Sequence, residues 1–255
     1  VWRAADQAFH WTDIPGRALW RWTPASDRLD HWTLPQMAGC LAPRGDGWLL
    51  AMEDGLYACG PLVAGQPCQP RPLAPVRHGA PGMRFNDGRC DASGRFWIST
   101  MCMDMARGAP VGAWYCLDER GLNGPYCEGL ITPNGSAFSP DRHTFYFSDS
   151  HPSVQKVWAF DFDLATGVLA NGREFLDMTA MPGRPDGAAV DVGGNYWICA
   201  NDAGQIHRFS PSGQHLASLE VPVAKPSMCA FGGPGLNTLL VTSIQPLGPV
   251  AGLSG

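Results

Sequence analysis

A short hairpin pattern repeats along the chain, and this repeat constrains the fold more than any other feature. Each copy has a turn rich in Asp, Gly or Pro, then a short aromatic strand, then a second turn and strand. A period of about 40–50 residues with several strands per unit is typical of a β-propeller. The equivalent strand positions, 37, 49, 50, 50 and 43 residues apart, are Trp11, Trp48, Trp97, Phe147, Trp197 and Leu240.

Six copies of this pattern predict an all-β fold, a six-bladed β-propeller. A β-sandwich also has strands that alternate with turns, but it does not require the same hairpin six times. The composition agrees with short strands, because the chain has 31 Gly, 23 Pro and 10 Trp and only 16% charged residues. No segment has a strong helical pattern. We therefore predict a single propeller domain over residues 1–255.

The charge balance and the cysteines limit the partners and the compartment. Lys and Arg number 18 against 23 Asp and Glu, a formal charge of −5 with no basic run, which predicts no nucleic-acid binding. No apolar run approaches ~18 residues, so we predict no membrane partner. The nine cysteines are odd in number and contain no CxxC pair, so we expect reduced thiols in a cytoplasmic protein.

Three polar motifs precede aromatic strands at similar distances: "RFNDG" at 84–88, "TPNG" at 132–135 and "RPDG" at 184–187. Equivalent positions of different blades converge at one mouth of a propeller channel. We therefore expect Asn86, Asn134 and Asp186 to approach one another, although 48 and 52 residues separate them. Amide and carboxylate oxygens at one point suit a divalent cation. Taken singly, each motif also fits an ordinary turn.

The same stretches carry a resemblance to a known family. "RFNDGRCDASGRFWISTM", "TPNGSAFSPDRHTFYFSDS" and "RPDGAAVDVGGNYWICANDAGQIHRFSPSG" resemble the SMP-30/gluconolactonase/LRE (regucalcin-like) family of sugar lactonases, in the right order and within a match over nearly the whole chain. The resemblance implies a six-bladed propeller with one divalent metal ion in its channel. It also implies hydrolysis of a small-molecule sugar lactone, an aldonolactone, to the aldonic acid.

The resemblance also assigns roles to residues of this chain. Asn134 matches a metal ligand of the family, and Asp186 matches a metal ligand that is also the proposed catalytic base. Arg84 and Asn86 match residues that bind substrate, with the Asn close to the metal or its water. Asp104, in "STMCMD", matches an acidic residue that contacts sugar hydroxyls. Oxygen ligands admit Ca, Zn, Mg, Mn or Fe(II).

The resemblance also predicts what lies beyond the two ends of the chain. The first metal ligand of the family is a Glu that falls three residues before Val1. By this comparison the chain lacks the extreme N-terminal segment of the family and its last C-terminal strands.

Other functions and roles stay open at this point. One alternative is a non-catalytic calcium- or metal-binding regulatory propeller, and another is a propeller hydrolase of non-sugar lactones or esters. Arg84 could instead pair with a neighbouring Asp, and Asp87 is expected to stabilise a turn rather than act as a base. The sequence does not predict the oligomeric state.

Overall fold

In a computed structural model, which describes residues 1–245, the repeated hairpins form antiparallel sheets in which all strands but one pair with a neighbour in the chain. The chain divides into two compact units. Unit 1 comprises residues 1–90, 94–132 and 231–238, and unit 2 comprises residues 91–93, 133–230 and 239–255. The single domain over residues 1–255 stays a prediction. The prediction about the last C-terminal strands concerns a part of the protein outside the described residues.

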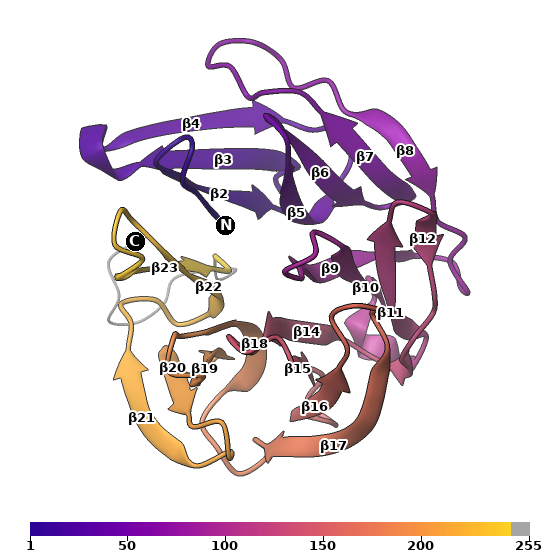
Figure 1. Ribbon diagram of the computed structural model, residues 1–255, viewed down its shortest axis with the longest axis vertical. Helices are drawn as coiled ribbons and strands as arrows, with labels where there is room; N and C mark the ends of the chain where they lie inside the picture. The colour runs from indigo at the N-terminus through magenta and orange to yellow at the C-terminus, as the bar shows by residue number, and fades with distance from the viewer. Residues whose placement is uncertain (246–255) are drawn as a thin grey trace. The chain divides into compact units, whose positions relative to one another are not determined.

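Unit 1 contains three sheets and two short 3₁₀ helices. Figure 1 shows β5 between β2 and β9, and these first or second strands of successive sheets contact one another. The elements are β1 (Trp2–Arg3), β2 (Ala8–Asp13), β3 (Ala18–Thr23), η1 (Pro24–Ser26) and β4 (Arg28–Thr33); β5 (Ala38–Arg44), β6 (Gly47–Met52), β7 (Gly55–Cys59) and β8 (Arg71–Pro75); β9 (Met83–Cys90), β10 (Phe96–Cys102), η2 (Met105–Arg107), β11 (Gly112–Asp118), β12 (Gly121–Asn123) and β13 (Glu128–Leu130).

Unit 2 contains two four-stranded sheets of the same topology. The elements are β14 (Pro133–Phe138), β15 (Thr144–Asp149), β16 (Lys156–Phe162) and β17 (Leu169–Asp177), followed by β18 (Arg184–Val190), β19 (Tyr196–Asn201), β20 (Gln205–Phe209) and β21 (His215–Glu220). Strands β22 (Pro226–Gly232) and β23 (Thr238–Ser243) form a further two-stranded sheet, whose residues fall partly in each unit.

The blade architecture is confirmed, but the predicted number of blades is wrong for the described residues. Five sheets have the four or five strands of a complete blade within residues 1–245, not six. The sixth repeat contributes only β22 and β23. The count of six rested on second strands, and Leu240 does lie on such a strand, but a second strand alone does not supply the outer pairing partners of a blade.

Alternating side chains of the second strands pack between successive sheets. In unit 1, Trp48 and Leu50 of β6 lie in one hydrophobic cluster with Trp32, whereas Leu49 lies in another cluster with Phe85. Successive strand residues point to opposite faces, so β6 is buried on both. Full burial of such a side chain contributes about 1.5–3 kcal/mol. The matching cluster of unit 2 includes Ala137, Tyr146, Val157, Leu176, Ala188, Tyr196, Ile198 and Phe209.

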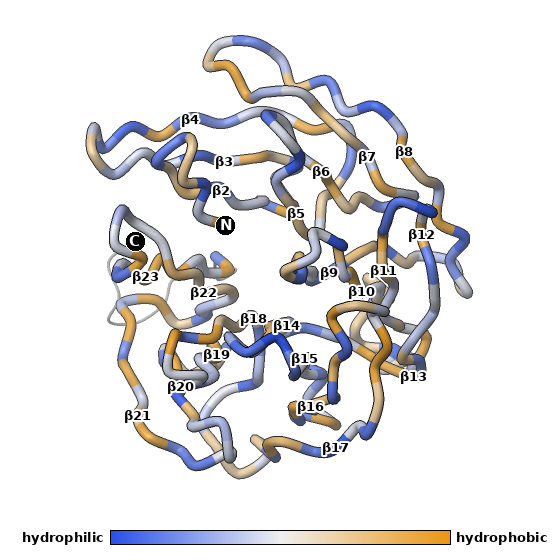
Figure 2. Tube along the Cα trace, in the orientation of Figure 1, coloured by the Kyte–Doolittle hydropathy of each residue, from blue (hydrophilic) through white to orange (hydrophobic). Residues whose placement is uncertain are grey.

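The last strands of the blades are largely exposed. In β21, five of the six residues are exposed, and β8 is similar. Figure 2 shows hydrophobic segments interrupted by hydrophilic ones along β4 and β21, as expected for strands with one face toward solvent. Within residues 1–245, no helix has the length and apolar character needed to cross a membrane. By contrast, the three polar motifs lie on the first strands β9, β14 and β18, which are buried or half-buried.

Candidate functional site

The "RFNDG" motif forms a β-bulge in β9. Phe85 pairs with Thr100 of β10 and Gly88 pairs with Ile98, so two residues of β9, Asn86 and Asp87, lie opposite a single residue of β10. A bulge of this kind re-aims the side chains of the extra residues and occurs often beside functional sites.

The other two motifs form bulges at the same register. In β14, Asn134 pairs with Ser148 before the register shifts, and in β18 the shift follows Pro185. Three residues beyond each motif residue, Arg89, Ala137 and Ala189 pair with Trp97, Tyr146 and Trp197. Asn86, Asn134 and Asp186 are therefore equivalent, as the repeat predicted, but the residue of β15 that is equivalent to Trp97 is Tyr146 and not Phe147.

In unit 1, Arg84 is hydrogen-bonded to the motif that it begins. Its Nη1 atom donates to Oδ1 of Asn86 at 2.8 Å and to the carbonyl of Phe85 at 2.7 Å. Asn86 is buried, and Arg84 is half-buried. On β10 the residue paired with Arg84 is Met101, which has no side-chain oxygen to accept a bond. The guanidinium of Arg84 and the amide of Asn86 are thus joined by a direct hydrogen bond.

Asp87 and Asp104 have different environments. Asp87 is buried, its Oδ1 atom accepts the backbone N–H of Gly88 at 2.8 Å, and its carbonyl accepts Oγ of Ser99 at 3.0 Å, so it stabilises the bulge as predicted. Asp104 is exposed and directly precedes η2. It lies at the Arg84 end of the sheet, because Arg84 pairs with Met101.

In unit 2, Asn134 and Asp186 lie on neighbouring first strands. Gly135 has a φ of +63°, and a Cβ atom there would lie 3.0 Å from the carbonyl oxygen of Asp186 and 2.6 Å from Oη of Tyr196. Tyr196 donates from this hydroxyl to the carbonyl of Gly135 at 2.7 Å. Only glycine suits both the backbone angle and the approach. The "NG" and "DG" motifs therefore bring the backbones that carry Asn134 and Asp186 close together.

Ser150, which follows β15, connects these two strands. Nδ2 of Asn134 donates to Oγ of Ser150 at 2.7 Å, and that hydroxyl donates to the carbonyl of Pro185, next to Asp186. Ser150 is buried. Because the amide nitrogen of Asn134 is held in this way, its oxygen is the atom suited to bind a cation. Sequence reasoning missed Ser150, although a third polar residue in a row after the apolar run "FYF" is a signal.

Asn201, the last residue of β19, holds the carboxylate of Asp186. Its Nδ2 atom donates to Oδ2 of Asp186 at 2.8 Å, and only 2% of Asn201 is exposed. Nη2 of Arg184 donates to Oδ1 of Asn201 at 3.3 Å, which fixes the orientation of the amide. Sequence reasoning missed Asn201 too, where a polar residue ends the apolar strand "YWICA".

Arg184 also forms an ion pair at the edge of this network. It contacts Asp202 at 2.7 Å, and Lys225 contacts the same carboxylate at 3.1 Å. Partial burial acts to raise the pKa of Asp202, but the hydrogen bonds from Arg184 and Lys225 outweigh it and hold the pKa below its ordinary value. The network thus runs from Lys225 through Asp202 to Arg184, and from Arg184 through Asn201 to Asp186.

The donor set of unit 2 fits a hard divalent cation in kind. One carboxylate and one amide oxygen are ligands that Ca²⁺ and Mg²⁺ prefer. Residues 1–245 contain no group of three His, Cys, Asp or Glu side chains arranged to hold a metal ion. A cation at Asn134 and Asp186 would therefore complete its shell with other oxygen donors, such as amide oxygens, backbone carbonyls or water.

The predicted site residues are divided between the two units. Arg84, Asn86 and Asp104 belong to unit 1, and Asn134 and Asp186 belong to unit 2. The structure brings Asn134 and Asp186 onto adjacent strands and places Arg84 and Asn86 in direct contact. The convergence of Asn86 with the pair in unit 2 stays a prediction.

Comparison with known proteins identifies the family. The sequence profile of the SMP-30/Gluconolactonase/LRE-like region matches residues 1–245. The chain belongs to this family. It is 36% identical over 244 residues to a 6-deoxy-6-sulfogluconolactonase of Pseudomonas putida, covering 95% of this chain and 81% of that protein. It is 30% identical over 243 residues to the pentonolactonase XacC of Haloferax volcanii, covering 95% and 79%.

A solved structure of the family confirms the fold class. The structure of a calcium-binding protein, regucalcin, from Agrobacterium tumefaciens matches with a TM-score of 0.88 at 30% identity, covering 97% of this chain and 81% of that one. The family resemblance of the three motifs is therefore confirmed, and so is the propeller class.

Proposed function

We propose that this protein hydrolyses a sugar lactone to the corresponding aldonic acid. The observation that carries the proposal is the pair Asn134 and Asp186, two oxygen-bearing side chains on adjacent bulged strands, with the carboxylate held at 2.8 Å by Asn201. Membership of a family whose relatives include a sulfogluconolactonase and a pentonolactonase supports the same reaction. Lactone hydrolysis needs an activated water and a stabilised oxyanion, and this pair offers both a base and a cation site.

Asp186 is proposed as the general base. Its carboxylate would take the proton from the water that attacks the lactone carbonyl. Asn134 and Asp186 would hold the divalent cation, one of Ca, Zn, Mg, Mn or Fe(II). When bound, such a cation polarises a carbonyl and lowers the pKa of water. Ser150 and Asn201 keep the two side chains in place through the hydrogen bonds described above.

Arg84, Asn86 and Asp104 are proposed to bind the polyol part of the substrate. The guanidinium of Arg84 is a planar fork that suits paired oxygens. Its hydrogen bond to Asn86 at 2.8 Å presents an amide and a guanidinium together. Asp104 is exposed at the same end of the sheet, where its carboxylate can accept hydroxyl protons. This polar set favours a sugar lactone over a lipophilic lactone.

A pH-indicator assay tests the reaction class. The protein is offered glucono-, xylono-, galactono- and arabinono-lactone, with the spontaneous rate subtracted, before and after chelation and after return of each cation. We expect turnover of at least one lactone that is lost on chelation and restored by a divalent ion. If no sugar lactone is turned over, or if chelation leaves the rate unchanged, the proposal is wrong.

The Asn134→Ala variant separates cation binding from the chemical step. We expect it to need at least ~10-fold more cation for half-maximal rate, because an oxygen ligand and its partner Ser150 are lost. At saturating cation the rate should recover most of its value. Asn171→Ala is a matched control, because Asn171 contacts only exposed Asp161 among the hydrogen bonds of its side chain. An unchanged cation requirement in Asn134→Ala would contradict the ligand assignment.

A non-catalytic cation-binding role is the second candidate, and the solved relative described as calcium-binding favours it. Isothermal titration with Ca²⁺ distinguishes the two. Tight binding of Ca²⁺ together with no turnover of any lactone in the presence of every cation would support this second role.

A further inference from the structure

A cavity lies between the end of β7 and the start of β8 in unit 1, away from the motifs described above. It encloses about 530 Å³ and is lined by the connection from residue 60 to residue 69 together with Trp32, Ala58 and Arg71. Ala58 pairs with Arg71, so the connection begins and ends at the same point of the sheet. The lactonase proposal assigns no role to this cavity.

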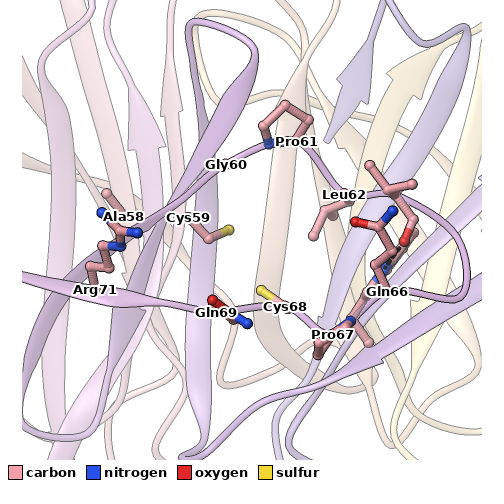
Figure 3. A pocket seen from close by; sticks show the side chains of 12 residues that line it. Ala58, Cys59, Gly60, Pro61, Leu62, Gln66, Pro67, Cys68, Gln69 and Arg71 are labelled. Atoms are coloured by element: carbon pink, nitrogen blue, oxygen red, sulfur yellow. Dashed lines mark hydrogen bonds between the residues drawn. The ribbon is translucent and has the colours of Figure 1, made fainter.

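Two cysteines face each other across this cavity. Cys59 ends β7, and Cys68 lies just before β8. Figure 3 shows their sulfur atoms directed toward one another from opposite sides of the opening. Both are free thiols of intermediate burial, and both pack against the hydrophobic cluster that contains Trp32 and Trp48. The pair is therefore close together and also reachable by a small reagent.

Two hydrogen bonds anchor the connection between the two cysteines at Leu62 and Val63. Nε1 of Trp32 donates to the carbonyl of Val63 at 3.0 Å, and Nη1 of Arg21 donates to the carbonyl of Leu62 at 3.2 Å. These bonds hold the segment against β3 and β4. The two thiols are thus held in register by a fixed segment rather than by a chance approach of loose chain.

The two thiols differ in acidity. The Cys68 thiol donates to the Cys59 sulfur, which outweighs burial and lowers the pKa of Cys59 below its ordinary value. The same hydrogen bond, together with burial, raises the pKa of Cys68. The thiolate is the attacking species in exchange with a disulfide, so Cys59 is the residue suited to attack first.

We propose that Cys59 and Cys68 form a dithiol modification site, which small-molecule disulfides oxidise to an intramolecular disulfide. The Cys59 thiolate attacks one sulfur of the disulfide, forming a mixed disulfide and releasing one thiolate. Cys68 loses its proton to solvent, and its thiolate attacks the Cys59 sulfur and expels the second thiolate. Two electrons and two protons pass from the dithiol to the small molecule, which becomes two thiols.

Cys199 and Cys229 of unit 2 provide a matched internal control. The Cys229 thiol is hydrogen-bonded to Cys199, and burial is the main cause that raises the pKa of Cys199. Both residues are fully buried, whereas Cys59 and Cys68 open onto the cavity. A hydrogen-bonded thiol pair without access to solvent should resist exchange.

The test is exchange with glutathione disulfide followed by mass spectrometry. The folded protein is equilibrated at stepped ratios of reduced to oxidised glutathione, quenched with acid, alkylated under denaturing conditions and digested with trypsin. Peptide 45–77 contains Cys59 and Cys68 and no other cysteine, whereas Cys199 and Cys229 fall in peptides 174–208 and 209–255.

We expect peptide 45–77 to lose both alkyl groups and two hydrogen masses as the ratio falls, while peptides 174–208 and 209–255 stay alkylated and unlinked. The disulfide closes a short loop, so the oxidised protein should melt about 5 °C higher than the reduced protein. Full alkylation of peptide 45–77 at every ratio would overturn the proposal. So would equal oxidation of the buried pair, because the cavity would then confer no selectivity.

Single variants identify the attacking thiol and do not depend on the stability of the disulfide. Cys68→Ser should keep a mixed disulfide of glutathione on Cys59. Cys59→Ser should react at Cys68 more slowly than Cys68→Ser reacts at Cys59, because the Cys59 sulfur alone accepts the backbone N–H of Trp48, which stabilises its thiolate. Equal rates in the two variants, or no mixed disulfide in Cys68→Ser, would contradict the assigned order.

Discussion

The strands β9 and β18 place an arginine and a polar residue at the same register, but the two arginines make different contacts. Within unit 1, Arg84 donates to Asn86, two residues along its own strand. In unit 2, Arg184 donates to Asn201 and to Asp202, on and beyond the neighbouring strand. The sequences "RFND" and "RPDG" alone would not predict this difference.

The difference comes from the paired strand. Arg84 lies opposite Met101, and Arg184 lies opposite Asn201. A methionine offers an arginine no strong acceptor, whereas Asn201 and Asp202 offer an amide and a carboxylate oxygen. Asn201, held by Arg184, can then turn its nitrogen to Asp186 at 2.8 Å. Equivalent motifs thus acquire different hydrogen-bond partners from the strand beside them.

The largest expected effect comes from exchanging the two motif residues. Asp186→Asn should lower kcat/KM at least about 10³-fold, because a general base is lost. Asn86→Asp should lower it about 10-fold, because a binding contact is altered rather than the proton acceptor. Steady-state kinetics with the preferred lactone measure both. Asp161→Asn is a control, since Asp161 is exposed and pairs with Arg173. Equal losses in the two exchanged variants would show that the register positions are interchangeable.

Removal of the amide that holds Asp186 tests the role of the paired strand. Asn201→Ala should lower kcat/KM about 10- to 100-fold. The hydrogen bond from Asn201 orients the carboxylate, so its loss should lower kcat while KM stays nearly unchanged. A merely structural role would lower the fraction of folded protein instead, and an unchanged kcat per folded protein would remove Asn201 as a positioning residue.

The Met101→Asn variant would give unit 1 the contact that unit 2 has. An amide opposite Arg84 should draw the guanidinium away from Asn86 and raise KM about 5-fold with a smaller change in kcat. Met101→Leu is the matched control and should keep both constants, provided that thermal melting shows both variants folded. An unchanged KM in Met101→Asn would mean that the paired residue does not direct Arg84.

The smallest expected effect concerns the ion pair at Asp202. Asp202→Asn should lower the free energy of unfolding by at most about 1 kcal/mol at pH 7, because the pair is exposed and screened. The pKa of Asp202 is held low in the folded protein, so its contribution is present above the unfolded pKa of about 3.9 and is lost as the pH falls through the lower folded value. Urea unfolding from pH 7 to pH 3 should show the wild-type and variant curves converging at acid pH.

Repeat spacing and motif chemistry predicted part of the site correctly. The spacing placed Asn86, Asn134 and Asp186 at one register before any contact was known, and the bulges in β9, β14 and β18 confirm it. The same spacing predicted six blades, where residues 1–245 form five and a two-stranded sheet. A repeat reports that a hairpin is present, but the number of strands in a sheet depends on which segments pair.

The sequence by itself determined the class of fold, the family and the residues able to do chemistry, because periodicity and residue type are local properties. Tertiary structure decided which groups act on those residues. Ser150 and Asn201 reach Asn134 and Asp186 from neighbouring strands, and Cys59 meets Cys68 across a cavity. Such partners depend on strand pairing and on the path of a connection, so the sequence can mark Ser150 and Asn201 as polar ends of apolar strands but not what they contact.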